Sequence, residues 1–397
     1  MISKLGVDAS QRGRDHCRLK GGGPDGDFRI TVLGWYGNGN AGDEAVLSCL
    51  LSDMRSIRSD ATLRVFSGDP EETRKTHGVV AIKKALLRNW REAAQTIRSS
   101  QLFVMGGGTL ICDEDAAYSG IASFCAYMMI AMSASVPIVF YAQGIGPVRR
   151  TLNRWLVQKL VDRVDLITVR DQASIDTLHE LAITRPPIFL TADPAARLVP
   201  ASRERARAIL QAENIPATQG PRVALCLKSR LGVEPEMARL ADALIAELNA
   251  HVVLVPMQST GLYNDLEASR LVHGQVSRPD RVSVIAGTYT PQEIKGILGE
   301  MDMVLAMRLH ASIFASAMAV PVLAISYSDK VAGFLTSIGQ ERWSIDLSEL
   351  DARVVVERAR GLWEARETVR QELATAMVGY QERSRATVGH ISRILNT

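Results

Sequence analysis

Residues 28–44 read FRITVLGWYGNGNAGDE, and this stretch decides the expected fold. Its first part, Phe28–Gly34, is short, apolar and rich in β-branched residues, as expected of a buried strand. The loop at residues 34–42 contains four glycines, and a helix is predicted from about Asp43 to Arg58. A strand, a glycine-rich turn and a helix in this order are typical of the first unit of an α/β fold.

The same alternation of strands and helices runs through residues 28–200 and begins again in residues 201–345. A hinge is expected between the two parts, at Pro200–Pro221. This pattern predicts an α/β protein with two doubly wound, Rossmann-like domains and an interdomain cleft. We expect residues 1–27 to form a flexible tail, because they are polar and glycine-rich. Residues 346–397 are charged and amphipathic, which predicts C-terminal helices.

The bulk composition limits the class of function. The chain has 397 residues, a formal net charge of +3 and 22% charged residues. A charge this balanced does not indicate a nucleic-acid-binding protein. The five cysteines are scattered and form no C-x-x-C pair, which indicates reduced thiols in a cytoplasmic protein. We therefore expect neither a metal site nor a redox cofactor.

One apolar stretch, residues 118–142, is long enough to cross a membrane and carries no charge. Pro137 interrupts it, and a strand is predicted at Pro137–Ala142, where a membrane span would have to continue as a helix. The stretch is better explained as a buried helix followed by a buried parallel strand.

Glycines and polar side chains follow several of the predicted strands of the first domain. Ligands of doubly wound folds bind beyond the carboxyl ends of the strands, and glycine lets the backbone approach them closely. The candidate binding residues are Asn38, Asn40, Asp43, Glu44, Gly107, Gly108 and Gln143. An alternative stays open for each loop: Asp43 caps its helix, and the glycines serve only turns or packing.

Cationic side chains follow strands in both domains. The candidates are Arg170, Lys228, Arg230, Arg308, His310 and Lys330. Neighbouring parallel strands bring such ends together, and guanidinium and ammonium groups indicate a small, multiply charged anion. His310 has a proton to donate near neutral pH. It also remains open that Arg170 only pairs with Asp171 or Asp193.

Seven segments recur, in this order, in a known family: GWYGNGNAGDEAVL, MGGGTLICDE, YAQGIGPV, TVRD, TADPA, VPMQ and AMRLHASIFASAMAVPVLAISYSDKV. Between Ile30 and Phe334 the chain resembles the polysaccharide pyruvyl transferases. The resemblance implies a GT-B-like fold, phosphoenolpyruvate as donor, and a sugar or lipid-linked oligosaccharide as acceptor. The implied product is a pyruvate ketal on two sugar hydroxyls, made in cell-surface polysaccharide biosynthesis.

By motif, the resemblance assigns Arg308, His310, Lys330 and Arg170 to the donor site. The segment CLKSR departs from the family pattern, so that either Lys228 or the arginine two residues later completes the site. The hypothesis is that the cations bind the donor and that His310 protonates its methylene carbon as general acid.

The polar and glycine-containing loops of the first domain are then expected on the acceptor side. A lipid-linked acceptor would bring the protein to the inner face of the membrane, and a homo-oligomer is left open. Two other functions also remain: a GT-B glycosyltransferase that uses a nucleotide sugar, and a non-catalytic relative in polysaccharide assembly. An enolpyruvyl transferase that stops at the enol ether is a third.

Overall fold

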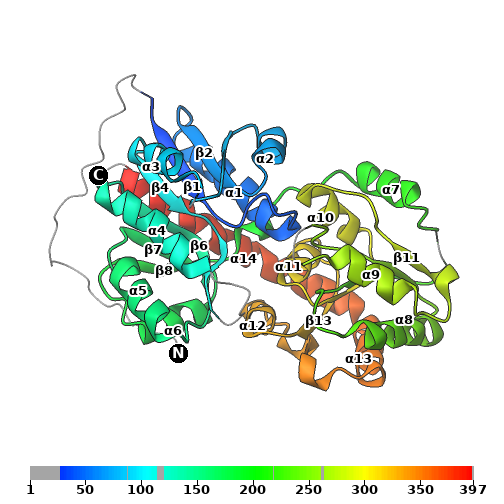
Figure 1. Ribbon diagram of the computed structural model, residues 1–397. Helices are drawn as coiled ribbons and strands as arrows, with labels where there is room; N and C mark the ends of the chain where they lie inside the picture. Colours follow the sequence, from blue (N-terminus) through cyan, green and yellow to red (C-terminus); the bar gives the residue numbers. More distant parts are fainter. Residues whose placement is uncertain (1–26, 87, 114–119, 218, 261–262, 396–397) are drawn as a thin grey trace.

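The computed structural model describes residues 27–395 except 87, 114–119, 218 and 261–262. Two parallel β-sheets, each covered by helices, form two domains that lie side by side (Figure 1). The prediction of two Rossmann-like domains is therefore confirmed. The predicted flexible tail falls almost wholly on residues outside this description.

The N-terminal sheet has the strand order β3-β2-β1-β4-β6-β7-β8, and β5 pairs with β6. Its strands are β1 Arg29–Leu33, β2 Thr62–Ser67, β3 Val80–Lys83, β4 Leu102–Met105, β5 Gly108–Ile111, β6 Ile138–Ile145, β7 Leu166–Val169 and β8 Ile188–Leu190. The helices of this domain are α1 Ala41–Ile57, α2 Pro70–His77, α3 Trp90–Arg98, α4 Gly120–Ser133, α5 Thr151–Val161, α6 Gln172–Glu180 and the short η1 Pro194–Arg197.

The C-terminal sheet has the order β11-β10-β9-β12-β13-β14. Its strands are β9 Arg222–Cys226, β10 His251–Leu254, β11 Val282–Val284, β12 Met303–Ala306, β13 Val322–Ser326 and β14 Ser344–Asp346. Its helices are α7 Arg203–Ala212, α8 Glu234–Leu248, α9 Asp265–His273, α10 Pro291–Gly299, α11 Leu309–Ala317, α12 Asp329–Ser337, α13 Ala352–Glu364 and α14 Arg366–Leu395, with short η2 Pro279–Arg281, η3 Glu341–Trp343 and η4 Leu347–Glu349.

The strand order reverses at the same place in both sheets. β1 lies between β2 and β4, and β9 lies between β10 and β12, with every pair parallel. A crevice opens at such a reversal, beyond the carboxyl ends of the strands. The loops after β1 and β4 and the loops after β9 and β12 therefore meet there. Three of the sequence motifs lie in these loops.

The apolar stretch at residues 118–142 divides as predicted. It contains α4, then a break, and then most of β6. β6 is buried along its whole length, whereas α4 is buried on one side only. No helix in the described part of the chain combines the length and the apolar character needed to cross a bilayer.

Helix α14 runs back from the C-terminal domain across the N-terminal domain (Figure 1). The hydroxyl of Tyr380 accepts a hydrogen bond from the backbone N–H of Asp193, at 3.2 Å. Nearly three helical turns further on, the ring of His390 stacks on Phe189 with ring centres 3.7 Å apart. The last helix therefore joins both domains rather than forming a separate unit.

Candidate active site

A cleft of about 570 Å³ lies between the two domains. Its walls combine residues from loops of both sheets. The N-terminal domain contributes Trp35, Asn40, Asp43, Gly108, Thr109, Cys112 and Arg170, and the C-terminal domain contributes Lys228, Met257, Gln258, Tyr263, Arg308, Leu309, His310, Tyr327, Ser328, Lys330 and Val331. All of the residues proposed for the donor and the acid except Arg230 therefore line one cavity, together with the rings of Trp35, Tyr263 and Tyr327.

Arg308 lies two residues beyond the end of β12 and forms the N-cap of α11, and its side chain lines the cleft. Its guanidinium donates two hydrogen bonds to Asp265, from Nε to Oδ2 at 3.0 Å and from Nη2 to Oδ1 at 2.6 Å. Asp265 is fully buried. Such a bidentate pair fixes the plane of the guanidinium, so that its remaining N–H groups are pre-oriented for a ligand.

His310 lies in the first turn of α11 and reaches across to the N-terminal domain. Its Nε2 lies 3.6 Å from Oδ2 of Asp193, and its ring packs against Gly42 at the start of α1. A Cβ added to Gly42 would lie 2.0 Å from Nδ1 of His310, so this position has no room for a side chain. The absence of a Cβ at Gly42 is what lets the imidazole sit between the domains.

Arg170 is buried at the end of β7 and donates a hydrogen bond from Nη1 to Oδ2 of Asp193 at 2.6 Å. Its Nη2 donates to Oγ1 of Thr109 at 3.3 Å, and the side chain also lines the cleft. The ion pair left open by the sequence is thus present, and it does not remove Arg170 from the site. Burial alone would raise the pKa of Asp193, but Arg170 and His310 hold it well below its usual range.

Asp193 is held from a third side by Tyr380 of α14. Tyr380 and His390 lie ten residues apart on α14. Of the two contacts that these residues make, only that of Tyr380 adjoins the cleft, because its partner Asp193 also contacts Arg170 and His310. Asp193 connects Arg170, His310 and this helix.

Two lysines complete the cationic wall. Lys330 lies in the first turn of α12, and Lys228 follows β9. The ammonium of Lys228 lies 4.0 Å from the centre of the Tyr327 ring, a cation–π contact that holds it at the cleft. Arg230 is exposed and does not line the cleft. The structure therefore favours Lys228 over Arg230 as the cation supplied by this segment.

Asp43 faces the cations from the N-terminal domain. It lines the cleft and is 8% exposed, and Gly108 lies close enough that a Cβ there would be 2.9 Å from its Oδ1. Burial raises the pKa of Asp43 to about 6, against the opposing effect of His310. The helix cap is provided by Asn40, whose side chain accepts from the N–H groups of Gly42 and Asp43. The reading of Asp43 as the cap is therefore wrong.

Four of the candidates on the acceptor side do not line the cleft: Asn38, Glu44, Gly107 and Gln143. Glu44 accepts a hydrogen bond from the N–H of Gly37 at 2.7 Å and contacts His77, so it braces the loop. Gln143 is fully buried and donates to the carbonyls at the end of β4. A Cβ on Gly107 would lie 2.6 Å from Val46, which indicates tight helix–strand packing. These residues therefore support the segments that line the cleft but do not line it themselves.

The two domains are joined directly at the glycine-rich loop. Asn40 forms an antiparallel bridge with Gln258, and the N–H of Ala41 donates to the carbonyl of Met257 at 2.9 Å. The carbonyl of Asn38 accepts from Oγ1 of Thr260 at 3.1 Å. These contacts close one end of the cleft and fix how far apart its two walls stand.

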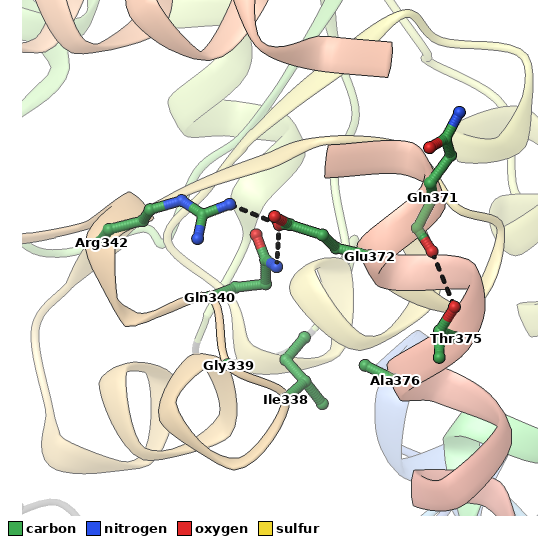
Figure 2. Close-up of a pocket in the computed structure, with 8 residues that line it drawn as sticks. All are labelled: Ile338, Gly339, Gln340, Arg342, Gln371, Glu372, Thr375 and Ala376. Atoms are coloured by element: carbon green, nitrogen blue, oxygen red, sulfur yellow. Dashed lines mark hydrogen bonds and ion pairs between the residues drawn. The ribbon is translucent and has the colours of Figure 1, made fainter. Parts of the chain in front are cut away.

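A second hollow lies on the C-terminal domain, where the segment after α12 meets α14 (Figure 2). Glu372 projects from α14 between Gln340 and Arg342, and accepts hydrogen bonds from both. The charged groups of this hollow therefore satisfy one another. This arrangement braces α14 against its domain and offers no cationic cluster of the kind found in the cleft.

The sequence did not single out Asp265, Thr109, Tyr263 or Tyr327 as site residues. Asp265 begins α9, where an acidic residue is ordinarily read as a contribution to the helix terminus. Its pairing with Arg308 joins residues 43 positions apart and has no local signal. Tyr327 directly follows β13, and this position at a strand end is the one feature that could have suggested it. Tyr263 lies nine residues beyond the end of β10 and has no such signal.

Comparison with known proteins identifies the family. A family model described as polysaccharide pyruvyl transferase matches residues 40–329. The chain belongs to this family. The match includes Arg170, Lys228, Arg308 and His310 and ends one residue before Lys330. The amylovoran biosynthesis protein AmsJ of Erwinia amylovora is 21% identical over 407 residues, which cover 88% of this chain and 95% of AmsJ.

The fold of this family member is similar to that of several solved proteins. MnaA of S. aureus, solved with UDP, has a TM-score of 0.66 at 13% identity, covering 93% of this chain and 97% of MnaA. HepE of Anabaena, in complex with UDP-glucose, has a TM-score of 0.64 at 15% identity, covering 93% and 99%. The expected GT-B-like architecture is confirmed by these similarities, which concern the fold alone.

Proposed function

We propose that this protein transfers the pyruvyl group of phosphoenolpyruvate to two hydroxyls of a sugar, forming a cyclic ketal and releasing phosphate. The observation that supports it most is the convergence of Arg170, Lys228, Arg308 and Lys330 with His310 on one cleft. Phosphoenolpyruvate carries a phosphate and a carboxylate close together. Four cations held at different points of a cavity wall suit such a ligand better than a singly charged one.

His310 is the proposed general acid. Its proton goes to the terminal methylene carbon of the donor, and positive charge develops on the neighbouring carbon that bears the carboxylate and the phosphate ester. One sugar hydroxyl then bonds to that carbon. The carbon–oxygen bond to phosphate breaks, the second hydroxyl closes the ring, and the two hydroxyl protons leave to a base and to the departing phosphate. Asp193 positions the imidazole for the first step.

Asp43 is the proposed base on the acceptor side. It lines the cleft from the N-terminal domain, whereas Lys228, Arg308 and Lys330 line it from the C-terminal domain. With a pKa of about 6 it is ionised near neutral pH. A carboxylate with that pKa accepts a hydroxyl proton more readily than an ordinary surface aspartate. The backbone at Gly108 leaves the space beside Asp43 in which a sugar hydroxyl would lie.

The direct test is a thermal-shift titration of the purified protein with phosphoenolpyruvate, with UDP and inorganic phosphate as controls. A ligand that binds only the folded state stabilises it by about 2.7 kcal/mol at a hundredfold excess over its Kd. We expect phosphoenolpyruvate to raise the melting temperature in the wild type and not in Arg308→Ala. No shift with phosphoenolpyruvate, in the presence or absence of acceptor sugars, would contradict the proposal.

A nucleotide-sugar enzyme is the second candidate, because MnaA and HepE were solved with UDP and UDP-glucose. The cationic cleft would then hold a diphosphate. A shift with UDP but not with phosphoenolpyruvate would favour this function. The position of His310 beside the cations favours the pyruvyl transfer, since a proton donor is needed there for protonation of the donor's carbon.

A further inference from the structure

Helices α3, α4 and α5 form an outer face of the N-terminal domain with an unusual surface. α4 packs between α3 and α5, and Figure 1 shows the three helices on the same side of the sheet. α4 contains no charged residue, although part of it faces solvent. An exposed helix of a globular protein ordinarily carries charged residues on its outer side. We call α3–α5 and the preceding Arg149–Arg150 the outer face.

Large apolar side chains protrude from all three helices. Trp90 on α3 is 56% exposed, Met129 on α4 48%, and Leu152 and Trp155 on α5 67% and 54%. Among the described residues, Trp90 and Trp155 are the tryptophans whose side chains are exposed rather than partly buried. Single exposed apolar residues need no explanation, but a group of them on adjacent helices marks an interaction surface.

The same face is strongly basic. Exposed cations flank the apolar side chains at Arg88, Arg91, Arg149, Arg150 and Lys159. Helix α5 contains no acidic residue, α4 contains none, and Glu92 is the acidic residue of α3. Tryptophan and leucine surrounded by arginine and lysine match the boundary of an anionic membrane, where rings enter the headgroup region and cations meet phosphates.

We propose that the outer face docks the protein on anionic lipid membranes. The face is linked to the cleft through Asp113, whose carboxylate accepts hydrogen bonds from the N–H groups of Arg149 and Arg150 at 2.7 and 2.9 Å. Asp113 directly follows Cys112, which lines the cleft. Docking here would place the cleft near the membrane surface, which suits a lipid-linked sugar as acceptor. The presentation of such an acceptor rests on the proposed function, whereas the binding of lipid by the outer face does not.

Vesicle flotation tests the proposal. Wild type should float with vesicles containing phosphatidylglycerol and remain unbound with pure phosphatidylcholine, and binding should weaken as salt is added. Leu152→Ser/Trp155→Ser should lose at least tenfold in partitioning, and Arg150→Glu at least fivefold, since one basic side chain near such a surface contributes about that factor. The matched control Leu271→Ser/Val354→Ser removes exposed apolar side chains from the other domain and should bind as wild type does.

Circular dichroism of each variant checks that it folds, and the melting shift with phosphoenolpyruvate reports on the cleft separately. Loss of vesicle binding with that shift unchanged supports the docking face. A wild type that binds no anionic vesicle, or a Leu152→Ser/Trp155→Ser variant that floats as well as wild type, overturns it. A dimer that depends on Leu152 and Trp155, without vesicle binding, would assign the face to a second copy and overturn it equally.

Discussion

Nε2 of His310 lies 3.6 Å from Oδ2 of Asp193, and the two residues belong to different domains. The same Oδ2 accepts the 2.6 Å hydrogen bond from Arg170. The proposed acid and one of the donor-binding cations are therefore positioned by one buried carboxylate. Replacing it should affect chemistry and donor binding together, whereas replacing His310 should affect chemistry alone.

His310→Gln should abolish turnover and retain the melting shift with phosphoenolpyruvate, because glutamine has no proton to give at neutral pH but fills similar space. The measurement is ketal formation alongside the shift. His179→Ala, which removes an exposed histidine on α6, is the control and should behave as wild type. Unchanged turnover in His310→Gln would end the proposed acid role.

Asp193→Asn should lower turnover and reduce stability by about 3 kcal/mol, because it leaves Arg170 buried without its anionic partner. The pKa of Asp193 is lowered in the folded protein, so its stabilising effect is present above its unfolded pKa, near 4, and is lost as the pH falls below it. Melting temperatures between pH 6 and 3 should therefore fall less steeply in Asp193→Asn than in wild type. Parallel curves would contradict this assignment.

Lys228→Ala and Arg230→Ala form a matched pair two residues apart. Lys228 lines the cleft and Arg230 does not, so only Lys228→Ala should weaken the shift with phosphoenolpyruvate. We expect a loss of about tenfold or more in apparent affinity, the usual effect of removing a charged hydrogen-bonding group. Equal losses in both variants would show that Arg230 turns inward when the donor binds.

Asp43→Asn should remove the acidic limb of the pH–rate profile. If Asp43 is the base, its ionised form is the active one, so the rate should rise with pH through about 6 and level off above it. Rates measured from pH 5 to 8 check this. The asparagine variant should be slow at every pH, and a surviving limb near pH 6 would assign the base to another group.

Gly42→Ala should reduce turnover strongly, because its Cβ would displace the ring of His310. Gly389→Ala is the control, since a Cβ at Gly389 meets nothing within 4 Å. Both changes place alanine in a helix, where it is favoured over glycine by about 1 kcal/mol. A Gly42→Ala variant as active as wild type would show that the imidazole has another position.

Much of the fold could be predicted from the sequence, because its apolar runs and glycine turns are local signals. The strands predicted at Phe28–Gly34 and Pro137–Ala142 are present as β1 and β6, with ends that differ from the prediction by one to three residues. The edge strands β3 and β14 are short and carry little apolar pattern, and were missed. So was β5, which begins within a run of glycines that reads as a turn.

The site was predicted where it depends on parallel strands placing their ends together, as for Arg308 and His310. The sequence did not predict that the side chain of Gln143 would hydrogen-bond to a backbone carbonyl instead of lining the cleft. It also did not predict the pairing of Asp265 with Arg308, which come from distant segments. Both contacts depend on how distant elements pack in three dimensions, and such packing produces no periodic pattern in the sequence.

The long helix α14 also limits how the protein can be divided. Although it ends the chain, it covers Phe189 and holds the backbone at Asp193. A fragment cut near residue 200, between the two sheets, would expose the surface that α14 covers and leave part of the N-terminal domain without its packing partner. The two halves are thus better regarded as one cooperative folding unit, in which the chain's final residues help to assemble a site built mostly from loops far ahead of them.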